Sequence, residues 1–269
     1  MIGNKIKKFW AFLLTLWLSF WPVVALACNT NAPDFELSSA ERFTAADSDA
    51  WAFATDMTFE GWIKYETLPA DTGSSVMQWL WVGDSPNISW RLFDVTNGFK
   101  LCTSAAGNNI NCTATIDKGS FTTGVWYKWS VVYHQAAGTA DYCWNGTSLA
   151  TGQTGLNTSI YNGTDVLAIG ADNDGAADYV DGLMDEVRIS NTARYTAGSC
   201  TTETDNFTND ANTVALWHFD GAGDFLTDSS SNSHTLTNVN TVTQSSDVPY
   251  TGACGGAVPR RRPSIIFFN

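Results

Sequence analysis

The 269-residue chain is acidic, with 14 Lys and Arg side chains against 27 Asp and Glu, and 44% of its residues are hydrophobic. This charge argues against nucleic acid and anionic membrane surfaces as partners, because basic patches drive both kinds of binding. The apolar content can fill a sizeable core, and the length suits one large domain or two small ones.

Residues 1–27 have the pattern of an export signal. Three lysines within the first eight residues precede an apolar stretch that ends in Ala25-Leu26-Ala27. This order of basic, apolar and small-residue regions predicts a cleaved signal peptide. A retained membrane anchor is the alternative, because the apolar stretch is nearly long enough to span a bilayer. Removal of the signal leaves 11 basic side chains against 27 acidic ones, a net charge of −16.

Cys28 directly follows the expected cleavage site. It is either an ordinary first residue or an acylated one, as in bacterial lipoproteins. Lipoprotein signals usually carry Leu three residues before the Cys, where this chain has Ala25. We therefore expect a protein that is secreted, on the cell surface or periplasmic, without a membrane span after cleavage, and keep a lipid anchor at Cys28 as the alternative.

The other end of the chain, 255–269, is a basic and apolar tail. Three arginines, 260–262, precede the apolar run 265–268. Chain termini are usually loose, so a disordered tail is the expectation, and a docking or sorting tail is the alternative. If the tail is ordered, it could add as an edge strand to a neighbouring copy and support self-assembly.

Six cysteines suggest disulfides, because an exported protein folds in an oxidising compartment and the chain has no C-x-x-C or other metal-binding spacing. Cys102 and Cys112 bracket a Gly- and Asn-rich turn between two strand-like runs, which suggests a bridge across a hairpin. Cys200 and Cys254 bracket the last segment and could form a second bridge. Cys28 and Cys143 would then remain as a third pair, but connectivity cannot be deduced from sequence alone.

The chain has the pattern of an all-β protein throughout. Short runs rich in Val, Thr, Phe, Trp and Tyr are separated by Gly, Asn, Asp and Ser clusters, and no long stretch has a helical period. Asn145-Gly146 predicts a tight hairpin turn between two of these runs. The runs that predict strands are 57–65, 76–82, 88–95, 126–133, 141–149, 166–170 and 183–189. Many short strands at close spacing predict a two-sheet antiparallel β-sandwich or jelly roll over 28–254.

Four motifs in chain order resemble the laminin G-like jelly roll of the concanavalin A-like lectin/glucanase superfamily. The clearest is 179–194, YVDGLMDEVRISNTAR, which looks like the closing strand of that family. Upstream, 57–65 (MTFEGWIKY), 124–133 (GVWYKWSVVY) and 142–146 (YCWNG) match further strands in the same order. The resemblance implies a lectin-like binding domain. It departs from the family where 212–234 resembles the segment that usually opens the domain. This segment either supplies the missing first strands in a permuted arrangement or begins a second, truncated repeat, and we expect it to pack on the same core because it is too short for a second sandwich.

The glucanase branch of this superfamily carries its catalytic acids on one strand, as Glu-x-Asp-x-(x)-Glu. The nearest acids here, Asp185 and Glu186, are adjacent and so should point to opposite faces of a strand. None of the three histidines, His134, His218 and His234, has a metal-binding spacing. The sequence therefore predicts no catalytic residues and a protein that is not an enzyme.

Calcium is the cofactor that the resemblance implies, as a structural ion at an edge of the sandwich. Calcium takes oxygen ligands from carboxylates and loop carbonyls. The residues that the resemblance brings together are Asp185, Asp220, Asp228 and Asn232. The alternative for Asp185 is a hydrogen-bonded structural acid.

Carbohydrate binding would use exposed aromatic rings that stack on sugars, with a few polar groups nearby. Trp79, Trp81, Trp90 and Trp144 flank loops and are the candidate ligand-binding residues, although burial in the core is the more common place for any one Trp. Trp79 and Trp81 should share one face of their strand, because alternate residues do so.

These features lead to three functional hypotheses. The first is a secreted, non-enzymatic, lectin-like module that recognises carbohydrate or a surface protein. A structural or adhesion subunit of a surface assembly is the second, and a glucan hydrolase with a diverged site is the third.

Overall fold

The computed structural model describes residues 29–175, 177–201, 205–221 and 225–251. The expected signal peptide, Cys28, Cys254 and the tail 255–269 lie outside the described residues. None of the helices in the described part has the length and apolar character to cross a bilayer.

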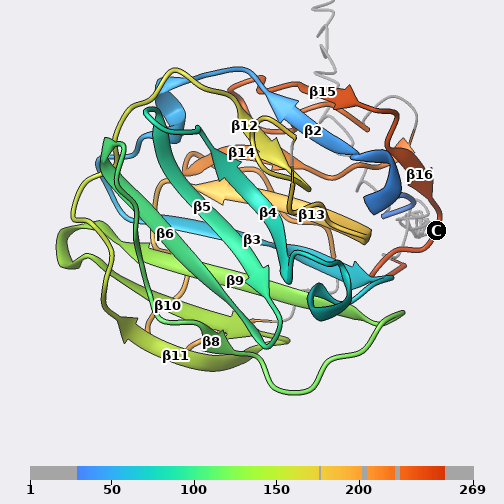
Figure 1. The fold of residues 1–269 in the computed structure, drawn as a ribbon, viewed down its shortest axis with the longest axis horizontal. Coiled ribbons are helices and arrows are strands. Elements are labelled where there is room, and N and C mark those ends of the chain that lie inside the picture. Colours follow the sequence, from blue (N-terminus) through green and yellow to red (C-terminus); the bar gives the residue numbers. More distant parts are fainter. Residues whose placement is uncertain (1–28, 176, 202–204, 222–224, 252–269) are drawn as a thin grey trace, which may run out of the picture.

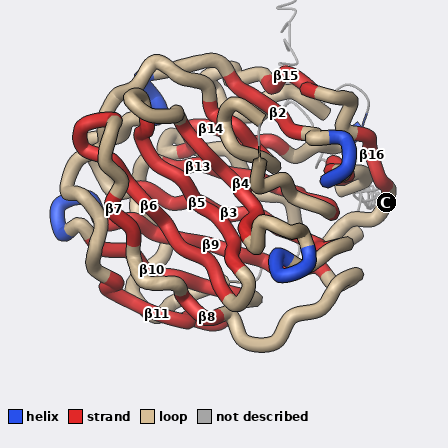
Figure 2. The backbone as a smooth tube through the Cα atoms, viewed as in Figure 1, coloured by secondary structure: helices blue, strands red, loops and turns tan. Residues whose placement is uncertain are grey.

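The described chain folds as the expected β-sandwich, with short 3₁₀ turns between strands (Figure 2). All seven runs that predicted strands contain them. One antiparallel sheet contains β1 (Ala32–Phe35), β3 (Met57–Tyr65), β9 (Trp126–His134), β10 (Thr139–Trp144), β11 (Thr147–Gln153), β13 (Gly182–Ser190), β14 (Thr213–Trp217) and β16 (Thr243–Ser245). The other contains β2 (Arg42–Ala45), β4 (Val76–Val82), β5 (Ile88–Val95), β6 (Gly98–Gly107), β7 (Asn111–Cys112), β8 (Ile116–Asp117), β12 (Leu167–Ile169) and β15 (Leu236–Val239). The 3₁₀ turns are η1 (Leu37–Ser39), η2 (Asp49–Trp51), η3 (Pro69–Asp71) and η4 (Gln135–Ala137).

The two sheets lie face to face, with β4, β5 and β6 over β3, β9 and β13 (Figure 1). In the first sheet the order is β11-β10-β9-β3-β13-β1-β16, with β14 also paired to β13, and in the second it is β15-β2-β12-β4-β5-β6-β7, with β8 also paired to β6. Large aromatic side chains from both sheets fill the space between them, among them Phe35, Phe59, Trp79, Trp90 and Trp129. Burying a side chain of this size contributes roughly 1.5–3 kcal/mol, so this layer holds the sandwich closed.

The C-terminal segment completes the same two sheets, as the resemblance implied. β14 pairs with β13, β15 with β2 and β16 with β1. Trp217 of β14 is fully buried in the common core and donates its indole N–H to the His234 carbonyl at 2.9 Å. The segment therefore supplies strands of one sandwich and begins no second one.

A β-bulge in β4 corrects the expectation that Trp79 and Trp81 share a face. The register shifts between Gln78 and Leu80, opposite β5, so that Trp79 is an extra residue. Trp79 packs in the core beside Trp129, at 5.1 Å between ring centroids. Trp81 lies on the opposite face, with the Arg91 guanidinium 4.9 Å from its ring centroid. An extra residue reverses the alternation of faces beyond it.

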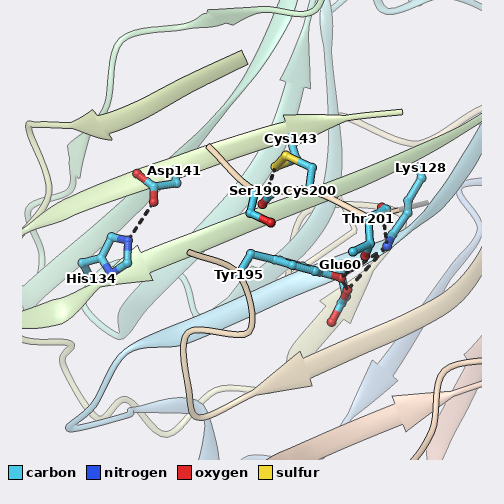
Figure 3. The surroundings of a disulfide bond; sticks show 9 residues. All are labelled: Glu60, Lys128, His134, Asp141, Cys143, Tyr195, Ser199, Cys200 and Thr201. Atoms are coloured by element: carbon cyan, nitrogen blue, oxygen red, sulfur yellow. Dashed lines mark hydrogen bonds and ion pairs between the residues drawn. A yellow bond between two sulfur atoms is a disulfide. The ribbon is translucent and has the colours of Figure 1, made fainter. Parts of the chain in front are cut away.

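Two disulfides join described residues. Cys102 pairs with Cys112 across β6 and β7, as expected, while Cys143 of β10 pairs with Cys200. The second pair corrects both Cys200–Cys254 and Cys28–Cys143. Cys200 belongs to the segment after β13, and the disulfide fixes this segment over the outer face of the first sheet (Figure 3).

Beneath that segment lies a buried charged group on the same face. Glu60 of β3 is fully buried and forms an ion pair with Arg188, at 2.7 Å between Oε1 and Nη2. Tyr195, from the covering segment, donates its hydroxyl to Glu60 Oε2 at 2.5 Å, and Lys128 donates to the Thr201 carbonyl at 3.0 Å. The Cys143–Cys200 disulfide therefore fixes the segment after β13 over a buried network of charged side chains.

Replacing both Cys143 and Cys200 by Ala should lower the free energy of unfolding by about 2–4 kcal/mol, the usual contribution of a disulfide. The matched control is the Cys102→Ala/Cys112→Ala variant. Its loop spans 10 residues against 57, so chain entropy alone makes its loss about 1.5 kcal/mol smaller. Urea unfolding of both variants under identical conditions measures the difference. Equal losses of unfolding free energy in the two variants would contradict the expected dependence on loop length.

Candidate functional site

A cluster of buried acids lies on the outer face of the first sheet, where β13 and β14 meet the N-terminal segment. A second β-bulge, in β13, positions the acids of this cluster. Between Asp185 and Arg188 the register of β13 against β3 shifts, and Glu186 adopts a left-handed backbone with φ of 49°. Such a φ is uncommon for a residue with a side chain, and strain of this kind gathers at functional sites.

The bulge also corrects the expectation that Asp185 and Glu186 point to opposite faces. Asp185 and Glu186 are both 0% exposed. Their hydrogen-bond donors place both beside Asp220: Asp185 accepts from Asn29 and Glu186 from the Phe207 N–H, while the adjacent Thr30 and Asn206 donate to Asp220. The structure thus brings Asp220 to the adjacent acids Asp185 and Glu186.

Neutral amides surround these carboxylates and donate to them. Asn29 Nδ2 donates to Asp185 Oδ2 at 2.8 Å, and Asn206 Nδ2 donates to Asp220 Oδ2 at 2.8 Å. The Thr30 backbone N–H donates to Asp220 Oδ1 at 2.6 Å. The carboxamide oxygens of Asn29 and Asn206 are buried and have no hydrogen-bond partner among the described residues. Orphaned buried acceptors are rare in folded proteins and need an explanation.

Electrostatics at this cluster disfavour three bare carboxylates. Burial, and then repulsion from Glu186, raise the pKa of Asp185 well above its usual range. Burial also raises the pKa of Glu186, although His218 opposes this through a 2.7 Å contact between Nδ1 and Oε1. A hard cation would offset the repulsion and could use the two orphaned amide oxygens as ligands. Carboxylate and amide oxygens are ligand types that calcium uses, although Asp185, Glu186 and Asp220 do not form a group whose carboxylate oxygens all lie within 4.8 Å of one another.

The four expected calcium ligands do not converge. Asp185 and Asp220 share the buried cluster, but neither Asp228 nor Glu186 forms with them a group of three acids whose ligand atoms all lie within 4.8 Å of one another. Both oxygens of Asp228 are used, since they accept hydrogen bonds from Leu216 of β14 and from Ser230 and His234 of its own loop. Asn232 donates to the Thr213 and Val214 carbonyls. Asp228 and Asn232 thus stabilise the loop after β14, which corrects their expected place beside Asp185.

A second acidic group lies where β1 and β3 end. Asp34, Glu36 and Glu66 each bring one carboxylate oxygen within 4.8 Å of the others. Glu36 and Glu66 are exposed and Asp34 is half-buried. This exposed triad could hold a metal ion. Burial, and then repulsion from neighbouring acids, raise the pKa of Asp34 and of Glu66, and Asp34 Oδ1 is buried without a hydrogen-bond partner among the described residues.

All four expected sugar-binding tryptophans are buried. Trp79 and Trp90 are fully buried, and Trp81 and Trp144 are 8% and 5% exposed. Trp144 stacks on Tyr127 at 5.1 Å between centroids, and the Trp90 indole N–H donates to the Trp51 carbonyl at 2.7 Å. These contacts are core packing, so the expectation of exposed stacking platforms is wrong at these positions.

The histidines lie in three separate places. His218 contacts Glu186 in the acidic cluster, and the His234 ring packs against Trp51 at 4.4 Å between centroids. His134, at the end of β9, lies between two carboxylates: Nε2 is 3.0 Å from Asp141 and Nδ1 is 3.3 Å from Asp56. Figure 3 shows the contact with Asp141 beside the disulfide.

The pair of carboxylates around His134 should make stability depend on pH. Burial alone would lower the pKa of His134, but the hydrogen bonds to Asp141 and Asp56 outweigh it and raise the pKa. Because the pKa of His134 is raised in the folded state, its contacts with Asp141 and Asp56 contribute fully to stability below about pH 6.5, the pKa of His in the unfolded chain. This contribution is lost as the pH rises through the pKa of His134 in the folded state. The His134→Gln variant should therefore lose about 0.2–1 kcal/mol at pH 5.5, the range for exposed ion pairs, and less at pH 9. Urea titrations at both pH values test this, and a loss that grows with pH would contradict it.

Sequence reasoning missed three members of the cluster, namely Asn29, Glu186 and Asn206. Asn29 and Asn206 are 156 and 14 residues from the acids to which they donate. Asn206 stands in an N-x-T motif (Asn206-Phe207-Thr208), but that motif does not indicate a metal ligand, and Asn29 stands in no motif. Only the folded chain brings them to β13.

Comparison with known proteins agrees with this architecture. A family model for the concanavalin A-like lectin/glucanases superfamily matches residues 38–197. No protein with a curated description matches the chain. The matched range ends before β14, so the three C-terminal strands lie outside it.

Solved structures share the fold at low sequence identity. A candidate carbohydrate-binding protein of Bacteroides ovatus has 16% identity and a TM-score of 0.53, over 82% of this chain and 61% of the other. The mouse laminin α1 domains LG4-5 have 11% identity and a TM-score of 0.43, over 67% and 48% of the two chains. A pentraxin of Limulus polyphemus has 12% identity and a TM-score of 0.46, over 62% and 78%. The chain thus spans about three fifths of the Bacteroides protein, and the likeness to that protein concerns the fold alone.

Proposed function

Because this chain belongs to the laminin G-like family of the concanavalin A-like lectin/glucanases superfamily, we propose that it is a secreted, non-enzymatic module that binds carbohydrate. We further propose that the buried acidic cluster holds one structural calcium ion. Asn29, Asp185, Asp220 and Asn206 would supply its side-chain ligands. The ion would tie the N-terminal segment to β13 and to the segment after β14.

The observation that carries this proposal is the pair of orphaned amide oxygens beside three buried acids. Carboxylate and amide oxygens are the ligands that calcium prefers. Asp185 and Asp220 were expected ligands, and the buried Asn29 and Asn206 oxygens add two neutral donors beside them. Two disulfides among the described residues support an oxidising compartment, in agreement with secretion.

Burial argues against hydrolysis by the same acids. A glycosidase needs two carboxyl groups that reach the scissile bond of a bound sugar. Asp185 and Glu186 have no exposed surface, and Phe207 contacts Glu186 through its backbone N–H at 2.7 Å. A saccharide could reach neither carboxylate without displacing the chain above it.

A glycan array and a pull-down on insoluble polysaccharides test the proposal, each with the mature chain in calcium and in chelator. We expect binding to at least one neutral glycan class and weaker binding in chelator. The Asp185→Asn/Asp220→Asn variant should bind alike in both buffers. Flat results on every glycan would refute carbohydrate recognition. Release of reducing sugar that Asp185→Asn and Glu186→Gln abolish would show a hydrolase instead.

A further inference from the structure

A cavity of about 470 Å³ lies at the end of the sandwich. It opens where the turn η2, the end of β13, the start of β14 and the loop 228–234 meet. Its volume falls within the range of small-molecule sites, about 300–1,000 Å³. The walls include Ser48, Phe53, Asn191, Val214, Asn232 and His234.

The lining is polar but uncharged. None of the described side chains around this cavity belongs to Asp, Glu, Lys or Arg, although the chain carries 27 acidic residues. Phe53 and Val214 form an apolar part of the wall. A charged ligand would find no partner on these walls, whereas a neutral ligand with hydroxyl groups and a C–H surface would find both kinds of contact.

Hydrogen bonds fix the Asn232 side chain and leave its carboxamide oxygen able to accept another. Its amide nitrogen donates to the Val214 carbonyl at 2.8 Å and to the Thr213 carbonyl at 3.3 Å, which uses both N–H groups. The carboxamide oxygen has no bond to a described residue and lies on an exposed side chain. This oxygen can accept a hydrogen bond from a ligand without any side-chain rearrangement, which lowers the entropic cost of binding.

His234 is also fixed and incompletely bonded. Its backbone N–H donates to Asp228 Oδ2 at 2.7 Å, and its ring packs on Trp51. Nε2 is buried and has no partner among the described residues. Burial lowers the pKa of His234, although Asp228 opposes this, so the ring is neutral at pH 7. A neutral imidazole offers one donor and one acceptor, which suits a hydroxyl group.

We propose that this cavity is the carbohydrate site and that it takes one ring of a neutral saccharide. The inference rests on the function proposed above and assigns it to a place. Asn232 Oδ1 accepts from one sugar hydroxyl, the His234 side chain forms part of the wall beside the sugar, and Phe53 lies against the C–H surface of the ring. The site is distinct from the acidic cluster and from the four buried tryptophans.

Nuclear magnetic resonance of the mature, calcium-loaded chain tests the site directly. The probes are neutral methyl glycosides of glucose, galactose, mannose, xylose and N-acetylglucosamine, with galacturonic acid and sialic acid as charged comparisons. We expect at least one neutral glycoside to shift the His234 ring resonances in a saturable way. The acidic sugars should leave them unchanged at the same concentrations.

Three variants locate the binding. Ala211→Trp fills the cavity mouth from an exposed position and breaks no side-chain hydrogen bond. Asn232→Ala removes the free acceptor, and each of these two variants should weaken binding at least tenfold. Asn109→Ala, an exposed Asn in the turn between β6 and β7, is the matched control and should bind as the unchanged chain does.

The outcomes separate this inference from the proposed function. If a glycan binds but Ala211→Trp leaves its affinity unchanged, the cavity is not the site, while carbohydrate recognition stands. Preference for the acidic sugars would also overturn the inference. If neither the glycosides nor the glycan array gives binding, both the function and the site are wrong. Folding of each variant is checked by its urea midpoint, so that Asn232→Ala can be set aside if it unfolds and Ala211→Trp still decides.

Discussion

Replacing Lys118 by Met should lower the free energy of unfolding by about 3–5 kcal/mol, the cost of leaving a buried charge without its partner. Lys118 and Asp94 form an ion pair inside the sandwich, and neither side chain is exposed. Lys118 also donates to Tyr65 at 2.9 Å, and its ammonium lies 3.8 Å from the Phe121 ring centroid. Burial lowers the pKa of Lys118 to about 8 even with Asp94 beside it, which shows how far the pair is desolvated.

Two further variants are needed to interpret the loss of stability in Lys118→Met. Lys118→Met/Asp94→Asn removes both charges and should recover at least half of the loss, because no unpaired charge remains. Lys64→Met removes the cation of an exposed ion pair with Asp247, whose side chain is 46% exposed, and should cost less than about 1 kcal/mol. Urea unfolding followed by tryptophan fluorescence measures all three. Similar losses for Lys118→Met and Lys64→Met would contradict the burial of the Lys118 pair.

Calcium should stabilise the chelator-treated mature chain by about 2.7 kcal/mol when its concentration reaches a hundred times its dissociation constant. The ion would bind the folded cluster of Asn29, Asp185 and Asp220, and the unfolded chain holds no such cluster. Thermal unfolding in chelator and in increasing calcium measures the effect. Magnesium should stabilise less, because it requires stricter octahedral geometry and keeps several waters.

Asp185→Asn separates calcium binding from general destabilisation. The substitution removes one of the buried like charges, so in chelator the variant should stay within about 1 kcal/mol of the unchanged chain. It should then gain almost nothing from calcium. Asp34→Asn, in the exposed acidic triad, is the matched control and should respond to calcium fully. A loss of the response in Asp34→Asn, with Asp185→Asn still responsive, would move the ion to the triad.

Alternation of apolar and polar residues predicted the sheets well. The runs 57–65 and 76–82 are strands with those bounds, and the hairpin turns at Asn145-Gly146 as expected. Side chains on the inner face of a strand must be apolar to enter the core. A half-buried strand therefore shows apolar and polar residues in alternation, which can be read from its sequence. The same reasoning placed the C-terminal segment on the common core, because it is too short to close a sandwich of its own.

The errors arise where a strand departs from that period. Trp79 and Glu186 are extra residues in bulges, and each reverses or reorients the side chains next to it. A bulge depends on the register of the neighbouring strand, which the local sequence does not contain. Trp79, a candidate sugar-binding residue, therefore packs in the core on the face opposite to Trp81, and Glu186, expected on the face opposite to Asp185, is buried beside it.

Long-range pairings account for the rest. Cys143 pairs with Cys200 because the segment after β13 folds back over β10, and the cysteine spacing carries no record of that path. Asn29, the first described residue, donates to Asp185, which lies 156 residues further along the chain. Sequence could name Asp185 and Asp220 through resemblance to a family, but the amides that complete the cluster follow only from the fold.

Anomalous diffraction from a crystal of the mature chain grown in calcium tests most directly whether the buried acids form a cation site. One peak should lie among the side-chain oxygens of Asn29, Asp185 and Asp220, and crystals of Asp185→Asn should lack it. An absence of the peak in the unchanged chain, or a peak at Asp34, Glu36 and Glu66 alone, would contradict the account.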